Sequence, residues 1–169
     1  VPIISGVAHD STESLATVRR VPNEPGMAAK VFTLLAEAGV NVDMIVQASA
    51  STGTADISFT VPGSAAAKVR DVLQEKQDEL GYQSFDIDAN VGKVAVVGVG
   101  MKTHSGLAAK FFNALSDEGV NVLMISTSEI RIAALVPLEQ LQDAVRALHT
   151  AYGLDAEQVE AVVYGGTGR

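Results

Sequence analysis

Two short loops combine residue types that can bind a carboxylate group. Residues 25–29 place Gly26 before Met-Ala-Ala, and residues 105–109 place Gly106 before Leu-Ala-Ala. A glycine and small residues at the start of a helix leave its first backbone N–H groups unobstructed at the positive end of the helix dipole. One such loop alone is more typical of a structural turn. Its occurrence in duplicate favours a site for a small zwitterionic ligand.

Polar residues that could complete such a site follow each loop. They lie near the start of a predicted strand, and are Asn41 and Gln47 in the first copy and Asn121 and Thr127 in the second. Amide and hydroxyl groups can accept a bond from an ammonium group or bind a hydroxyl. The pattern therefore predicts a ligand with both acidic and basic ends.

The other chemistry-bearing residues form no catalytic group. His9, His104 and His149 lie in different segments without metal-ligand spacing, and the chain has no cysteine. The Gly-x-Gly at residues 98–100 lacks the third glycine of a dinucleotide-binding loop. Since no acid, base or nucleophile cluster is present, we expect no active site within this chain, no metal and no cofactor.

Composition narrows the class of protein further. The chain has 169 residues, with 12 Lys and Arg against 20 Asp and Glu, for a formal net charge of −8. That charge argues against a nucleic-acid partner. No apolar run approaches the length of a membrane span, so we expect a cytoplasmic protein that does not bind membranes. Hydrophobic residues make up 47% of the chain, which predicts a subunit interface.

The elements that position the two loops are duplicated as well. Residues 25–47 reappear as residues 105–127, with about half of the positions identical, which indicates a duplication. Apolar periodicity predicts the same order of elements in each copy, strand-helix-strand-strand-helix-strand. In the first copy, the elements expected after the first strand are a helix over 26–38, strands over 40–47 and 55–61, a helix over 64–80 and a strand over 83–87. In the second copy, they are a strand over 93–99, a helix over 106–118, strands over 120–126 and 129–136, a helix over 138–152 and a strand over 159–164.

This order predicts an α+β fold of two ferredoxin-like βαββαβ domains in tandem, each with both helices on one face of a four-stranded antiparallel sheet. We expect an N-terminal strand within residues 1–13, one domain over residues 14–89 and a second over residues 90–169. The N-terminal strand belongs to neither copy by sequence alone.

The residues resemble the regulatory ACT domains of bacterial aspartate kinases, and most closely the separate regulatory subunit. The motifs that carry the resemblance are IISGVAHD, PGMAAKVF, NVDMIVQ, VGKVAVVGVGM, ISTSEIRI and VVYGGTGR, and they extend over almost the whole chain. The kinase portion of that family has no counterpart here. The resemblance therefore implies a regulatory chain that does not phosphorylate a substrate by itself.

The resemblance also implies partners. It implies feedback inhibition of the first step from aspartate toward lysine, threonine and methionine, with threonine as an effector and lysine as a second one. ACT domains of this family pair across a dimer into continuous antiparallel sheets with effectors at the seam. We therefore expect a homodimer of the isolated chain and a complex with a catalytic aspartate kinase subunit.

Site residues are carried over from the family by position. For threonine they are Asn23, Gly26, Ala28 and Gln47 in the first copy, and Ala108, Asn121 and Val122 in the second. For lysine they are Asp43, Met101, His104, Gly106, Ser128 and Glu129. In this assignment, amides near Gly26 hold the effector carboxylate, Asn121 takes its ammonium, and Gln47 bonds a threonine hydroxyl.

Three alternatives remain open from the sequence. The chain could be the regulatory part of a single-chain aspartate kinase. It could be a free-standing amino-acid-binding module that regulates another protein, such as a transcription factor. An independent enzyme on this fold is the least favoured, because nothing in the sequence supplies its chemistry.

Overall fold

The computed structural model describes residues 3–99, 106–154 and 162–163. Contacts divide the chain into two compact units. Glu13–Ala89 holds the first copy of the repeat (the first-copy unit), and Val1–Thr12 together with Asn90–Arg169 holds the second (the second-copy unit). None of the helices in the described residues is long and apolar enough to cross a lipid bilayer.

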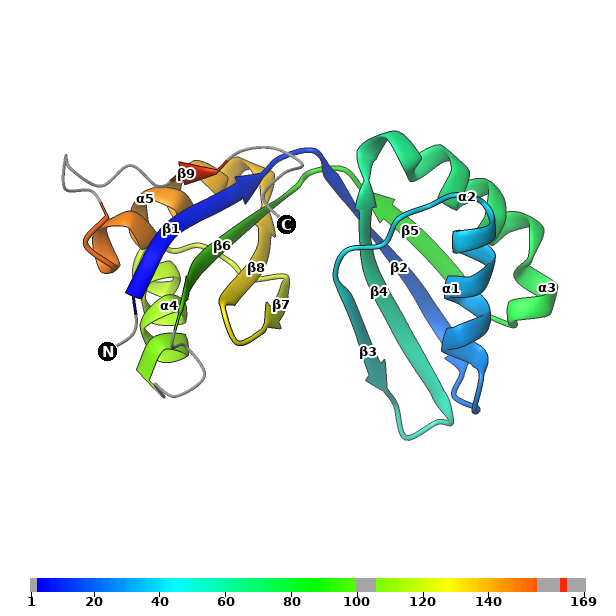
Figure 1. The fold of residues 1–169 in the computed structure, drawn as a ribbon. Coiled ribbons are helices and arrows are strands. Elements are labelled where there is room, and N and C mark those ends of the chain that lie inside the picture. The colour runs from blue at the N-terminus through cyan, green and yellow to red at the C-terminus, as the bar shows by residue number, and fades with distance from the viewer. Residues whose placement is uncertain (1–2, 100–105, 155–161, 164–169) are drawn as a thin grey trace. The chain divides into compact units, whose positions relative to one another are not determined.

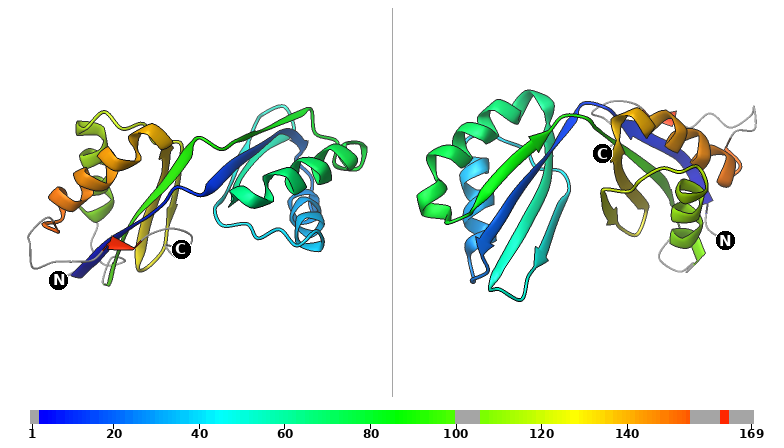
Figure 2. Two further views of the ribbon diagram at one scale, coloured as in Figure 1. Left: turned by 90° about the horizontal axis from the view of Figure 1, so that it is seen from above. Right: turned by 180° about the vertical axis from the view of Figure 1, so that it is seen from behind.

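The first-copy unit is a four-stranded antiparallel sheet with its helices on one face (Figures 1 and 2). Its elements are β2 (Glu13–Pro22), α1 (Met27–Glu37), β3 (Ile45–Ser49), β4 (Thr54–Pro62), the 3-10 turn η1 (Gly63–Ala65), α2 (Ala66–Glu75), α3 (Gln77–Leu80) and β5 (Ser84–Asp88). The strand order is β3-β4-β2-β5. This confirms the predicted ferredoxin-like fold.

The second-copy unit has a five-stranded sheet. Its elements are β1 (Ile3–Asp10), β6 (Val91–Val99), α4 (Gly106–Asp117), β7 (Met124–Thr127), β8 (Arg131–Pro137), the 3-10 turn η3 (Leu138–Gln140), α5 (Leu141–Ala151) and β9 (Val162–Val163). The strand order is β7-β8-β6-β1-β9, with β1 antiparallel to β6 and parallel to β9. The N-terminal strand thus takes the place beside β6 that β5 takes beside β2 (Figure 1).

Several predicted boundaries move. The strand predicted over residues 40–47 begins only with β3, because Val40 still belongs to the end of α1, where its N–H binds the Leu35 carbonyl at 3.0 Å. The helix predicted over residues 64–80 is divided at Lys76 into α2 and α3. In the second copy the strand predicted over residues 120–126 likewise begins late, with β7.

Apolar side chains on one face of each sheet and on its helices form the cores. In the first-copy unit, Val31 and Leu35 of α1 and Phe59 of β4 are at most 1% exposed. Burying such a side chain contributes about 1.5–3 kcal/mol. Other fully buried members are Ala16, Val18, Val21, Val61, Val69, Leu73 and Leu80. The corresponding core of the second-copy unit includes Val94, Val96, Phe111, Leu115, Ile132, Ala134, Val136 and Leu148.

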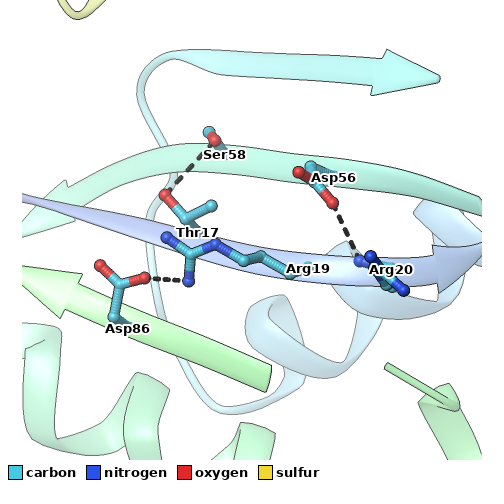
Figure 3. Close-up of polar contacts among 6 residues, drawn as sticks. All are labelled: Thr17, Arg19, Arg20, Asp56, Ser58 and Asp86. Atoms are coloured by element: carbon cyan, nitrogen blue, oxygen red, sulfur yellow. Dashed lines mark hydrogen bonds and ion pairs between the residues drawn. The ribbon is translucent and has the colours of Figure 1, made fainter. Parts of the chain in front are cut away.

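The helix-free faces of the two sheets differ in chemistry. In the second-copy unit this face carries the small apolar cluster of Ala8, Ala95 and Ala133. In the first-copy unit it carries polar side chains from β2, β4 and β5, including Thr17 and Asp86 (Figure 3). A sheet face can be polar in this way when the opposite face alone supplies the core.

Candidate functional site

The start of α1 offers backbone donors at the surface. Gly26 is the N-cap residue with φ 91, a left-handed conformation that glycine adopts readily. No side chain caps the helix, and its first turn contains no acidic residue. Within the described residues the Met27 N–H binds the Glu24 carbonyl, which leaves the amides of Ala28 and Ala29 as donors. This helix end can therefore bind an anionic group.

A chain of polar side chains lies beside this helix end. Gln47 Nε2 donates to Asn23 Oδ1 at 3.4 Å, and Asn23 Nδ2 donates to Ser49 Oγ at 3.2 Å. The Asn23 N–H donates to the Gly53 carbonyl at 3.0 Å. These bonds hold the loop after β2 against edge strand β3, so the Asn23 and Gln47 amides have fixed orientations.

These groups line one small cavity. Its volume is about 70 Å³, about half that of an engineered apolar cavity of about 150 Å³ that holds benzene. It brings together Asn23, Gly26, Ala28 and Gln47, four residues predicted for a threonine site. The remaining lining residues are Val21, Pro22, Glu24, Met27, Ala55 and Ile57.

Strand β2 enters this site through a bulge. Val18 pairs with Ile57 and Val21 pairs with Ala55, so two residues, Arg19 and Arg20, stand opposite one. Arg20 has φ 57, the one positive φ of a non-glycine residue in the described part of the chain. Holding a residue in such a conformation costs on the order of 1–3 kcal/mol, and such strain is concentrated at functional sites.

The second-copy residues predicted for threonine are not adjacent to one another. Ala108 lies in the first turn of α4, whereas Asn121 and Val122 lie beyond its C-terminal end. With 12 residues, α4 is about 18 Å long. The Asn121 N–H donates to Gln140 Oε1 at 2.9 Å, and its side chain is exposed. These residues therefore cannot form one pocket within their own unit.

The residues predicted for lysine are divided between the units. Gly106 begins α4, and Ser128 and Glu129 form the turn between β7 and β8, all in the second-copy unit. Asp43 precedes β3 in the first-copy unit, where it is half-buried. Met101 and His104 lie outside the described residues.

A tyrosine fixes the first turn of α4. The Tyr152 hydroxyl donates to the Leu107 carbonyl at 2.8 Å, and Lys110 Nζ lies 5.0 Å from the centre of its ring. Burial raises the pKa of Tyr152 to about 12, so this hydroxyl is a donor at neutral pH. Among the described residues no group of three or more His, Asp and Glu could hold a metal ion.

Sequence reasoning missed Ser49 and Asp56. Ser49 lies two residues after Gln47 on the same strand, so the two-residue period of a strand places both on one face and could have identified it. Nothing in the sequence distinguishes Asp56, because the bulge that it contacts depends on pairing between two distant strands.

Comparison with known proteins gives a consistent set of relatives. The ACT domain family matches residues 19–77 and 94–152. An aspartokinase of Corynebacterium glutamicum is 46% identical over 99% of this chain, and one of Mycobacterium tuberculosis is 44% identical over 99% of it. This chain spans about 40% of the length of each of these proteins.

Two solved structures contain chains that this chain matches over almost their whole length. One is described as aspartokinase alpha and beta subunits; it is 42% identical, with a TM-score of 0.85 over 90% of this chain and 100% of that chain. Another is the regulatory subunit of aspartate kinase from Thermus thermophilus in its ligand-free form, 36% identical with a TM-score of 0.83 over 88% of this chain and 98% of that one.

Proposed function

The chain belongs to the ACT domain family as the regulatory region of an aspartate kinase, and from this premise we propose that it binds threonine and thereby feedback-inhibits the kinase. The observation that carries the proposal is the cavity at the start of α1, where four residues assigned to threonine line one space. Allosteric regulation, rather than catalysis, is the activity of such a region.

Two groups of threonine, the carboxylate and the hydroxyl, have partners of suitable chemistry in this cavity. The carboxylate binds the amides of Ala28 and Ala29 at the positive end of α1. The hydroxyl bonds the amide of Gln47, which already donates to Asn23 and can exchange that partner for the ligand. Because Gly26 carries no side chain, the approach to these amides stays open.

A second chain completes the site in this proposal. The cavity of about 70 Å³ is too small to enclose a molecule with as many heavy atoms as an amino acid, so part of the ligand must be covered from outside. The covering chain supplies Asn121 and Val122, whereas Ala108 lies at the opposite end of α4 and cannot contact the same ligand from that chain. The Asn121 side-chain oxygen then accepts from the threonine ammonium.

Exposed apolar side chains support edge-to-edge pairing of ACT units in a homodimer. The large exposed hydrophobic side chains of the described residues lie on or beside edge strands β3 and β7, and are Ile45, Val46, Leu123, Ile125 and Ile130, between 38% and 55% exposed. An edge strand of this kind is a template for another strand. Pairing of these edges would extend each sheet across the dimer.

Lysine is proposed as a second effector at the start of α4. Gly106, Ser128 and Glu129 lie at one end of the second-copy sheet, where the backbone around Ser128 and Glu129 would contact the ligand. The family resemblance assigns the lysine side-chain ammonium to the carboxylate of Asp43. Met101, His104 and Asp43 complete the set that the family resemblance assigns.

The proposed partner is a catalytic aspartate kinase subunit. A relative solved as alpha and beta subunits, of which this chain covers 100% of one chain, supports it. Threonine would bind one arrangement of the complex better than another, and a coupling of about 1–3 kcal/mol corresponds to a change of about 5- to 150-fold in activity or affinity.

Calorimetric titration of the 169-residue chain tests the proposal. Threonine should bind, and valine, which has the same shape without the hydroxyl, should bind at least about tenfold more weakly, because Gln47 is left unpaired. At about 100 times its Kd, threonine should raise the free energy of unfolding by about 2.7 kcal/mol.

Two variants locate the site. Gln47→Ala and Asn121→Ala should each weaken threonine binding, whereas Gln74→Ala, which changes an exposed amide on α2 that does not line the cavity, serves as the matched control. Unchanged affinity in both site variants would refute the assignment, and lysine titrated in parallel separates the two effectors.

A further inference from the structure

The bulge in β2 decides which face of the sheet receives Asn23. Side chains alternate between the two faces of a strand, so one extra residue moves every later side chain to the opposite face. With the extra residue in place, Val21 is fully buried on the helix side. Asn23 follows two residues later and meets Gln47 and Ser49 on that side. A regular ladder would place Asn23 on the helix-free face instead.

A carboxylate holds this bulge. Oδ1 of Asp56, on β4, accepts a hydrogen bond from the Arg20 backbone N–H at 2.9 Å (Figure 3). In a regular ladder this amide would bind a backbone carbonyl, so the side chain replaces a partner that the bulge removes. The neighbouring acidic residue on the same face, Asp86, binds the Arg19 guanidinium in an exposed ion pair instead.

We propose that Asp56 is a positioning residue of the threonine pocket, because its carboxylate fixes the bulge that brings Asn23 to Gln47. The inference rests on the proposed function. Asp56 does not line the cavity, so it acts on the ligand only through the loop that follows the bulge. Its bond to a strained backbone position is the feature that separates it from the other outward residues of β4.

Threonine binding by two alanine variants tests the role. Asp56→Ala should raise the Kd for threonine by about tenfold or more, since a charge-assisted hydrogen bond is lost. Asp86→Ala removes the same charge from the same face and only an exposed ion pair to the Arg19 side chain, so the bond to the Arg20 amide stays and the Kd should change by less than about twofold. Both are titrated at a temperature where circular dichroism shows them folded. Equal affinity of Asp56→Ala and wild type would overturn the inference.

A second substitution, at Arg20, tests whether the Asp56 carboxylate acts by holding the bulge or in some other way. Glycine adopts a positive φ without strain, so Arg20→Gly allows the bulge to persist without Asp56. The double variant Arg20→Gly/Asp56→Ala should recover threonine affinity to within about threefold of wild type. A double variant as weak as Asp56→Ala alone would exclude the bulge as the cause.

A measurement without ligand keeps the two proposals distinguishable. The Asn23 amide, which binds the Gly53 carbonyl, should exchange its hydrogen about tenfold faster in Asp56→Ala than in Asp86→Ala. Unchanged exchange would overturn the role of Asp56 alone. A wild-type chain that binds no threonine would refute the proposed function, while the exchange rates still decide whether Asp56 positions Asn23.

Discussion

The two units lead into their first helices by different strand geometry. In the first-copy unit the Arg20 amide binds the Asp56 carboxylate in a bulge. In the second-copy unit the ladder between β6 and β8 continues without a register shift, and the Gly98 N–H binds the Ile130 carbonyl at 2.9 Å. Arg131 takes the position of Asp56 and cannot accept a hydrogen bond. The two copies thus share the fold and the glycine at the helix start, but within the described residues only the first copy has the bulge that directs the loop before its first helix.

The cores differ by an exchange of large and small side chains. Val31 and Phe111 occupy the same position of the repeated helix, and Phe59 and Ala134 the same position of the repeated strand. The large side chain is therefore on β4 in the first-copy unit and on α4 in the second-copy unit. Cores tolerate such exchanges when total volume is conserved.

Among the substitutions considered, loss of the Phe59 side chain should lower the free energy of unfolding the most. This side chain is fully buried and packs edge-to-face on Phe32, with ring centroids 5.5 Å apart. Phe59→Ala should lower the free energy of unfolding by about 3–5 kcal/mol in urea titration. Adding Val31→Phe copies the arrangement of the second-copy unit and should recover part of that loss. No recovery would mean that the two cores are not related by a simple exchange of volume.

A smaller effect is expected where β6 meets α5. A Cβ on Gly92 would lie 2.8 Å from Leu141 Cδ2 and 3.2 Å from Leu141 Cβ. In the first-copy unit the same two positions hold Ser14 and Ala66. Gly92→Ala should therefore cost about 1–3 kcal/mol by overpacking.

A double-mutant cycle isolates this contact. In a Leu141→Ala background, Gly92→Ala should cost less than about 0.5 kcal/mol, because the two closest atoms, Leu141 Cδ1 and Cδ2, are gone. An equal cost in both backgrounds, measured by urea unfolding, would show that glycine is needed there for another reason.

The smallest expected effect is a difference in acid sensitivity. All three histidines lie in the second-copy unit. Burial lowers the pKa of His9, His149 acts in the same direction, and Asp10 opposes both. The folded state then binds fewer protons than the unfolded state below about pH 6.5, so stability present above that pH is lost as the pH falls through the lowered pKa.

Amide exchange measured at pH 7 and pH 5 checks this difference after correction for intrinsic rates. Protection in the second-copy unit should fall toward pH 5, and His9→Gln should reduce that fall. The first-copy unit contains no histidine, so its amide protection should not show this histidine-dependent fall between pH 7 and pH 5. The same fall in His9→Gln as in wild type would assign the acid sensitivity to other groups.

Much of the fold could be predicted because the duplication repeats each signal. The helix starts at Gly26 and Gly106 indicate the same helix twice, and the alternation along β4 and the apolar run of β8 each indicate a strand at the same place in the repeat. Four residues assigned to threonine by family resemblance do lie around one cavity. The glycine at the helix start was also indicated by local pattern, whereas the assignment of the full set came from the resemblance.

The remaining features depend on contacts between distant segments. The position of β1 beside β6 follows from pairing of Ile3–Asp10 with residues near the middle of the chain, which no local period indicates. The bulge at Arg20 depends on Asp56 from another strand, and an arginine with positive φ has no compositional signal. The role of Asp56 could therefore be inferred only from the folded structure.

The placement of β1 also sets an order of events during synthesis. β1 leaves the ribosome before the first-copy unit, and its partner β6 is made only after that whole unit, a delay of roughly 4 to 16 s at about 5–20 residues per second. The first-copy unit is one continuous stretch and closes its sheet meanwhile. When Ala89 has emerged from the ribosome, the first-copy unit can be complete while β1 still lacks its partner β6.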